Sequence, residues 1–220
     1  MRSGVDTLAA DLQRIFGARL QSLVSYGDDH PDPDGVHTLA LVEHLAFQDL
    51  AACVPLVPGW RRSGLGVPLI LSRDEFLRTL DVFPVEYGSI IARHQVILGT
   101  QPFAGMQVND ADLRRACETQ VKSHLIHLRE GYLESAALPK ALGRLISASA
   151  PALRGLLANI ERLDPGAPSA CGLTPEFFQE IASAQDSTIA EPSALLARYV
   201  SAVERLWQHV DRWREGTRNS

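Results

Sequence analysis

The sequence predicts an α+β protein, with a small mixed β-sheet and its helices over residues 1–105 and an α-helical bundle over residues 106–220. Two observations predict this class. Short apolar runs typical of strands alternate with helical patterns up to Gly105. Beyond that residue, consecutive segments carry apolar stripes at the helical period, which is typical of a bundle.

The expected elements follow from the spacing of apolar residues and from the turn-forming residues between them. Gly17 ends the first helix, and the prolines and glycine of the acidic loop 28–35 exclude a helix or a central strand there. Pro55 and Pro58 are expected to end the second helix, and Pro151 to kink or split a later one. In chain order we expect helix 5–16, strand 20–26, strand 36–42, helix 43–57, strand 67–71, helix 73–80, strand 95–99, helix 110–136, helix 139–163, a loop over 164–172, helix 174–184 and a last helix from residue 192.

One of these elements carries a prediction about burial. Residues 36–42 are apolar at nearly every position, so this strand is expected to be covered on both faces of its sheet. The helix over 43–57 is expected from a helical pattern of apolar residues, namely Leu45, Phe47, Leu50, Ala51 and Val54.

Composition and charge restrict the class of partner. The formal net charge of -5 argues against broad binding to nucleic acid, which normally needs a basic face. Cys53, Cys117 and Cys171 lie far apart and lack metal-site spacing, as expected of thiols in a reducing cytosol. No apolar run approaches the roughly 18 residues of a membrane span. We therefore expect a soluble, cytoplasmic protein.

The stretch from Arg19 to Glu43 reads as a strand, an acidic turn and a second strand, with Tyr26-Gly27 at the end of the first strand. It resembles the start of the nucleotidyltransferase superfamily, which has a polymerase beta-like fold. In that family a strand ends in Gly-Ser, and the next strand carries Asp-x-Asp. The Gly-Ser backbone lies against a triphosphate, and the paired carboxylates hold two Mg²⁺ ions.

The chain further along is similar to a bacterial group of nucleotidyltransferase-domain proteins whose activity is not assigned. The order and spacing of four motifs carry this resemblance, which covers most of residues 1–163. The motifs are a Val-Pro-Leu strand, DVFP-x-E, RH-x-V-x-x-G and L-R-x-G-Y-L, here at 67–69, 81–86, 93–99 and 128–133. The resemblance implies that a nucleotide or small molecule binds in a cleft between the two domains, near Tyr26, Gly27, Arg93 and His94.

The acidic positions depart from the family pattern. Asp28 stands where the family has serine, and an aspartate there would repel a triphosphate. Val36 and Thr38 stand at the two metal-ligand positions. Glu86 is present, but the acidic residue expected three positions later is Ser89. The sequence therefore favours a degenerate, non-catalytic nucleotidyltransferase-like protein with no assigned cofactor or metal site.

Three alternatives remain open. An active enzyme would move a nucleoside monophosphate from a nucleoside triphosphate to a hydroxyl, with Mg²⁺ held by Asp28, Asp32 or Asp34 together with Glu86. A calcium loop at residues 30–41 lacks the glutamate required at its twelfth position. In the last alternative the chain has a structural or oligomerisation role, as a homodimer formed through its tryptophan-rich final helix.

Several histidines and tryptophans have both a binding and a structural interpretation. His94 can bind phosphate or, at the start of a strand, satisfy protein groups. His124 and His127 share a helix face, but zinc needs further ligands that the sequence does not nominate, so a partly buried, hydrogen-bonded pair is expected. Trp207 and Trp213 are expected to be core or interface anchors.

Overall fold

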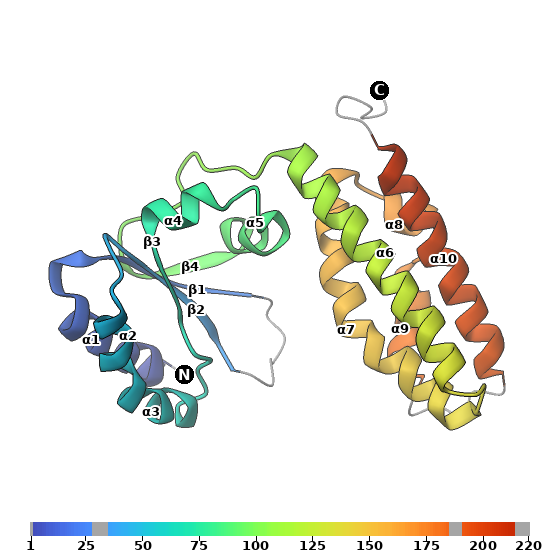
Figure 1. The fold of residues 1–220 in the computed structure, drawn as a ribbon, viewed down its shortest axis with the longest axis horizontal. Helices are drawn as coiled ribbons and strands as arrows, with labels where there is room; N and C mark the ends of the chain where they lie inside the picture. Colours follow the sequence, from blue (N-terminus) through green and yellow to red (C-terminus); the bar gives the residue numbers. More distant parts are fainter. Residues whose placement is uncertain (1, 28–34, 185–190, 214–220) are drawn as a thin grey trace. The chain divides into compact units, whose positions relative to one another are not determined.

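The computed structural model describes residues 2–27, 35–184 and 191–213 (Figure 1). The chain forms two compact units, Met1–Val108 and Asn109–Ser220. In the described residues the first unit holds a mixed four-stranded sheet with helices, and the second unit is helical. The predicted α+β class is therefore confirmed.

The sheet of the first unit has the strand order β3-β2-β1-β4. Its central strand β1 is antiparallel to both β2 and β4, whereas β2 and β3 are parallel. A parallel pair needs a long crossover, and three helical segments supply it between β2 and β3: α2 (Phe47–Cys53), η2 (Val54–Leu56) and α3 (Val57–Arg62). The four strands are β1 (Leu20–Tyr26), β2 (His37–Val42), β3 (Leu69–Ser72) and β4 (His94–Gly99).

Helices cover both faces of the sheet, and each face has its own core. α1 (Arg2–Phe16) packs on one face together with Trp60 of α3. A short η1 helix (Gly17–Arg19) joins α1 to β1. Phe76 of α4 and Tyr87 of α5 pack on the other face, where their rings stack 4.4 Å apart. These two helices span Arg73–Arg78 and Pro84–Ala92.

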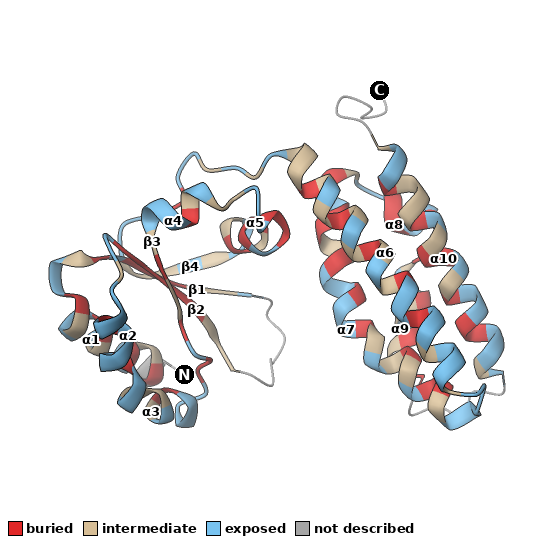
Figure 2. Ribbon diagram, viewed as in Figure 1, coloured by how far each residue is buried: buried red, intermediate tan, exposed pale blue. Residues whose placement is uncertain are grey.

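The second strand contributes to both cores. Leu39 and Leu41 lie in the core under α4 and α5. Ala40 and Val42 lie in the core under α1 and α3. All four side chains are buried, and Figure 2 shows the continuous buried colour along β2. The predicted coverage of this strand on both faces is confirmed.

α2 ends at Cys53, close to the predicted end at Pro55, but each proline begins a further helical segment. Pro55 lies in the first turn of η2, and Pro58 lies in the first turn of α3. A proline in the first turn sacrifices no intrahelical hydrogen bond, since the amide there has no partner within the helix. The chain therefore continues in helical segments from Phe47 to Arg62.

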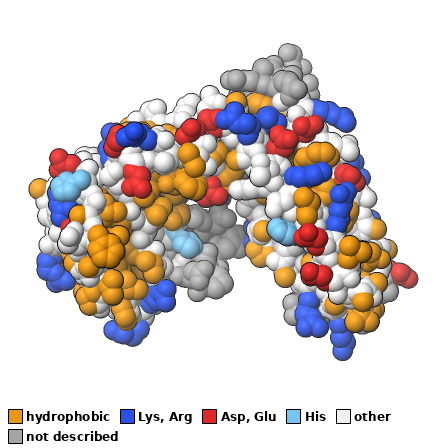
Figure 3. Space-filling model, viewed as in Figure 1, with side chains coloured by type: hydrophobic (Ala, Val, Ile, Leu, Met, Phe, Trp, Pro, Cys, Tyr) orange, Lys and Arg blue, Asp and Glu red, His pale blue; other side chains and the backbone are white. Residues whose placement is uncertain are grey.

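The apolar residues that follow the helical period over 43–57 do not all face the core. Phe47 is 80% exposed, and Leu50 and Val54 are exposed as well. Figure 3 shows hydrophobic side chains gathered over this part of the unit. Asp49 is buried instead, because it accepts hydrogen bonds of 2.9 and 2.8 Å from both terminal nitrogens of Arg19. α2 therefore turns Asp49 and Cys53 toward the core, and the ion pair with Arg19 stabilises this orientation.

The second unit is built from helices whose apolar faces meet. α6 is capped by Asn109, whose side chain accepts from the amide of Ala111. α9 is capped by Thr174, which accepts from the amide of Phe177. The described helices are α6 (Asp110–Glu134), α7 (Pro139–Leu163), α8 (Ala167–Ala170), α9 (Pro175–Ala182) and α10 (Pro192–Arg212).

Two predictions about this unit are corrected. α7 continues through Pro151, so the predicted split is wrong; the proline is exposed, while Ala150 and Leu153 beside it are buried and hold the helix in place. The expected loop over 164–172 contains the short helix α8. No helix in the described part of the chain is long and apolar enough to cross a membrane.

Candidate functional site

The end of β1 brings two predicted site residues, Tyr26 and His94, into one row with His37. Tyr26 lies directly opposite His37 on β2 and His94 on β4. Residues opposite one another in a ladder point to the same face of a sheet, which here is the face covered by α4 and α5. The rings of Tyr26 and His37 stack with centroids 5.7 Å apart. Burial raises the pKa of Tyr26, so its phenol keeps its proton at neutral pH.

His94 is held by protein groups through both ring nitrogens. Its Nδ1 lies 3.2 Å from the carbonyl oxygen of Ile90 and 3.0 Å from that of Ile91. Its Nε2 lies 2.7 Å from the side-chain oxygen of Gln101, and Phe103 packs edge-on against the ring. The imidazole therefore satisfies the last carbonyls of α5 and fixes where this helix meets β4.

Gly27 follows this row with a φ of +118°, a conformation that favours glycine. Among the described residues, a Cβ added there would have only His37 within reach, at 4.0 Å. Asp28, Asp32 and Asp34, the three aspartates considered as metal ligands, lie outside the described residues.

The start of β2 is fixed from both sides of its backbone. The amide of Val36 donates to the carbonyl of Gly64 at 2.9 Å, and the amide of Gly66 donates to the carbonyl of Val36 at 3.0 Å. Gly35 is required here, because its φ is +87° and a Cβ would lie 2.5 Å from the Gly64 oxygen. Val36 is thereby locked beside Leu65 as a half-buried apolar residue.

Thr38 is buried on the sheet face that α1 and α3 cover. It pairs with Ser25 of β1, and it alternates with Leu39, which points into the opposite core. Its side chain is 1% exposed, and within the described residues its Oγ1 has no hydrogen-bond partner. A lone hydroxyl in this environment is uncharged and sterically enclosed.

The predicted residues of α5 lie along one side of that helix. Glu86 is exposed in the first turn, where the helix dipole favours a carboxylate. Ser89 follows three residues later and is half-buried. Arg93 is exposed at the C-cap, directly before His94. Among the residues described, the structure forms no cluster of three or more His, Cys, Asp or Glu side chains that could hold a metal ion.

The histidines of the helical unit divide between a buried and an exposed role. His127 is exposed, whereas His124 is half-buried with its Nε2 2.6 Å from the Tyr199 hydroxyl. That hydroxyl lies 3.1 Å from Ser149 Oγ, which donates to the carbonyl of Ile146. The serine proton is thus used, so Tyr199 donates to Ser149 and His124 donates to Tyr199. Burial lowers the pKa of His124 to about 4, which keeps the ring neutral.

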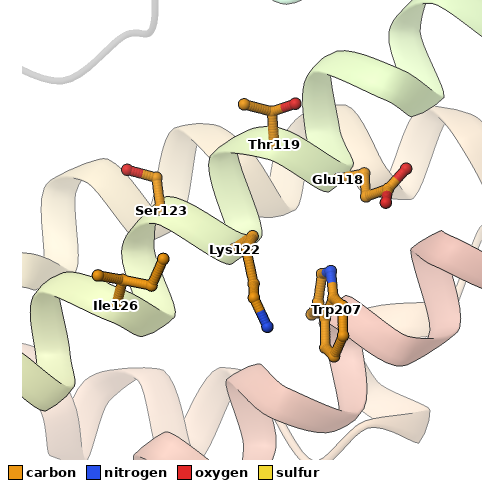
Figure 4. Close-up of a pocket in the computed structure, with 6 residues that line it drawn as sticks. All are labelled: Glu118, Thr119, Lys122, Ser123, Ile126 and Trp207. Atoms are coloured by element: carbon orange, nitrogen blue, oxygen red, sulfur yellow. The ribbon is translucent and has the colours of Figure 1, made fainter.

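Sequence reasoning missed one feature of this unit. Lys122 of α6 lies over the ring of Trp207 of α10, in a surface groove (Figure 4). The two residues are 85 positions apart in the sequence, and no local pattern links them. From the sequence, Trp207 was expected only to be a core or interface anchor.

Comparison with known proteins finds a solved structure of similar fold. No protein-family model matches the sequence, and no protein of curated function matches it. A solved structure is similar: the spectinomycin adenyltransferase from Enterococcus faecialis, with ATP and spectinomycin. The similarity has a TM-score of 0.50 at 12% identity, and it covers 96% of this chain and 99% of that one. This chain therefore has a nucleotidyltransferase-like fold followed by a helical region.

Proposed function

We propose that this chain is a degenerate, non-catalytic nucleotidyltransferase-like protein that binds a nucleotide or a related small molecule on its sheet unit. One observation carries the proposal. Val36 and Thr38 occupy the start of β2, where the resemblance places the metal-ligand carboxylates. The fold is that of a neighbour solved with ATP and spectinomycin, which supports a ligand of this kind.

The two residues are poor ligands for chemical and geometric reasons. Mg²⁺ requires oxygen ligands in near-octahedral geometry, usually with one or two carboxylates. Valine has no ligand atom, and the Thr38 hydroxyl points into a packed face at 1% exposure. Phosphoryl transfer depends on metal ions that bridge the phosphates and neutralise the developing charge. Replacing both carboxylates removes that contribution while leaving the strand intact.

The residues that remain can bind without catalysis. Gly27 has no side chain to block the approach of a ligand to its backbone, and the Tyr26 phenol next to it is a hydrogen-bond donor. Arg93 is an exposed guanidinium, the side chain best suited to phosphate oxygens. His94 orients this arginine, because its ring anchors the junction between α5 and β4. Binding would therefore rest on Tyr26, Gly27 and Arg93, with His94 as a positioning residue.

The test is nucleotide binding measured by thermal shift, with ATP, GTP, CTP and UTP in the presence of Mg²⁺. A nucleotide at a hundred times its dissociation constant stabilises the folded chain by about 2.7 kcal/mol, which raises Tm by several degrees. We expect Arg93→Gln to weaken this binding about tenfold, since a charge-assisted hydrogen bond is lost. The matched control is Arg73→Gln, because Arg73 is an exposed arginine at the start of α4.

Two outcomes would contradict the proposal. If no nucleotide raises Tm, the chain is not a nucleotide-binding protein, and a structural or oligomerisation role becomes the better interpretation. Light scattering then decides between a monomer and a homodimer. If Arg73→Gln weakens binding as much as Arg93→Gln, the binding is a general charge effect and not a site at the end of β1.

A further inference from the structure

A surface groove lies between α6 and α10 of the helical unit, whereas Tyr26, Gly27, Arg93 and His94 belong to the sheet unit. It is open to solvent and has a volume of about 430 Å³. Figure 4 shows the Lys122 side chain extending from α6 toward Trp207 on α10. Its lining residues are Glu118, Thr119, Lys122, Ser123, Ile126 and Trp207.

Lys122 is an unusual residue in this chain. Of the 21 lysines and arginines, only Lys122 and Lys140 are lysines. The Nζ of Lys122 lies 3.5 Å from the centroid of the Trp207 ring, so the indole holds the ammonium in a fixed place. An ammonium is a compact point charge with three N–H donors, and the ring face contacts it on one side only.

The other charges along this groove are already paired. Glu118 accepts a hydrogen bond of 2.7 Å from Arg114 on the preceding turn of α6. Arg129, further along α6, pairs with Glu204 of α10 at 3.1 Å. Within the described residues, Lys122 makes no ion pair with a carboxylate. The groove therefore presents one uncompensated positive charge.

We propose that this groove binds a small organic anion: an aromatic ring that carries a phosphate or carboxylate group. The anion lies at Lys122 Nζ, above the Trp207 ring. Thr119 cannot donate to it, because its hydroxyl already donates to the carbonyl of Arg115. The ring lies against Ile126, which is 42% exposed, and the half-buried indole of Trp207.

The two lysines allow a direct test by NMR. Reductive methylation with ¹³C-formaldehyde labels both side chains and keeps their positive charge. Lys122→Arg and Lys140→Arg assign the two signals. The probe is phenyl phosphate, with benzyl alcohol as a ring without charge and inorganic phosphate as a charge without a ring.

We expect millimolar phenyl phosphate to shift the Lys122 signal and leave the Lys140 signal in place. We also expect both partial probes to shift the Lys122 signal less at the same concentration. By calorimetry on the unmethylated protein, Lys122→Met weakens phenyl phosphate binding about tenfold, as expected for the loss of one charge-assisted contact, and Lys140→Met leaves it unchanged.

Each of four results would overturn the proposal. If neither lysine signal shifts, or if both shift equally, the groove is not a selective site. If benzyl alcohol shifts the Lys122 signal as much as phenyl phosphate does, the anion has no role. If inorganic phosphate shifts it as much as phenyl phosphate does, the ring has no role. None of these results bears on nucleotide binding by the sheet unit, which Arg93→Gln tests separately.

Discussion

Replacing Thr38 with valine is expected to stabilise the sheet unit. The side chain is 1% exposed, and its hydroxyl has no hydrogen-bond partner among the described residues. Leaving a buried polar group unpaired costs about 1–3 kcal/mol, and valine has nearly the same shape without the hydroxyl. After allowance for imperfect packing, we expect the free energy of unfolding to rise by about 1 kcal/mol, or about 2–4 °C in Tm for a chain of this size.

The assay is urea unfolding followed by tryptophan fluorescence. Trp60 is buried in the core of the sheet unit, so it reports on that unit alone once Trp207 and Trp213 of the other unit are replaced by phenylalanine. The matched control is Ser22→Ala. Ser22 is also buried in the sheet, but its hydroxyl donates to the carbonyl of Thr100 at 2.8 Å. Its removal should cost about 1 kcal/mol.

The reasoning about Thr38 is refuted if Thr38→Val lowers the free energy of unfolding by more than about 0.5 kcal/mol, beyond the usual effect of a neutral substitution. It is also refuted if the variant loses a nucleotide-dependent rise in Tm that the wild type shows. The first result would mean that the hydroxyl has a hydrogen-bond partner in solution. The second would mean that Thr38 acts as a binding group.

Three further predictions concern stability. Ala137 has a φ of +58°, so Ala137→Gly should stabilise by about 1 kcal/mol in thermal unfolding, whereas Ala148→Gly inside α7 should destabilise by a similar amount. The pKa of His124 is about 4 in the folded chain against 6.5 normally, so the unfolded chain binds the proton first as pH falls. Urea unfolding should then show about 2–3 kcal/mol of stability lost between pH 6.5 and pH 4, a loss that His124→Gln does not show. Arg19→Met should lower the urea midpoint by breaking the two-point pair with Asp49, while Arg14→Met, at an exposed pair, should leave the midpoint almost unchanged.

The fold was predictable where the pattern is local. The apolar run at 39–42 implied a strand covered on both faces, and it lies between two cores. The orientation of α2 was not predictable from spacing, because Asp49 is buried by Arg19 from 30 residues earlier. The pair also holds the pKa of Asp49 at about 2, chiefly through the hydrogen bonds from Arg19. A hydrophobic period cannot reveal an ion pair of this kind.

The candidate site was predictable in part. The resemblance assigned Val36 and Thr38 from the register of one strand, and the structure adds that Thr38 is enclosed and Val36 is locked by Gly64 and Gly66. The hydrogen bonds of His94 to the α5 carbonyls depend on where a helix ends, which spacing predicts poorly. The groove at Lys122 needs two helices to pack in a specific register, and the sequence contains no signal for that register.

Pyrophosphate release tests the central claim most directly. The wild-type protein is incubated with each nucleoside triphosphate and Mg²⁺, with and without spectinomycin, the molecule bound by the structural neighbour. We predict no release above the protein-free rate, even under conditions where a nucleotide raises Tm. Release that requires Mg²⁺ and disappears when Asp32 and Asp34 are both replaced by asparagine would contradict the account, since the chain would then be an active nucleotidyltransferase.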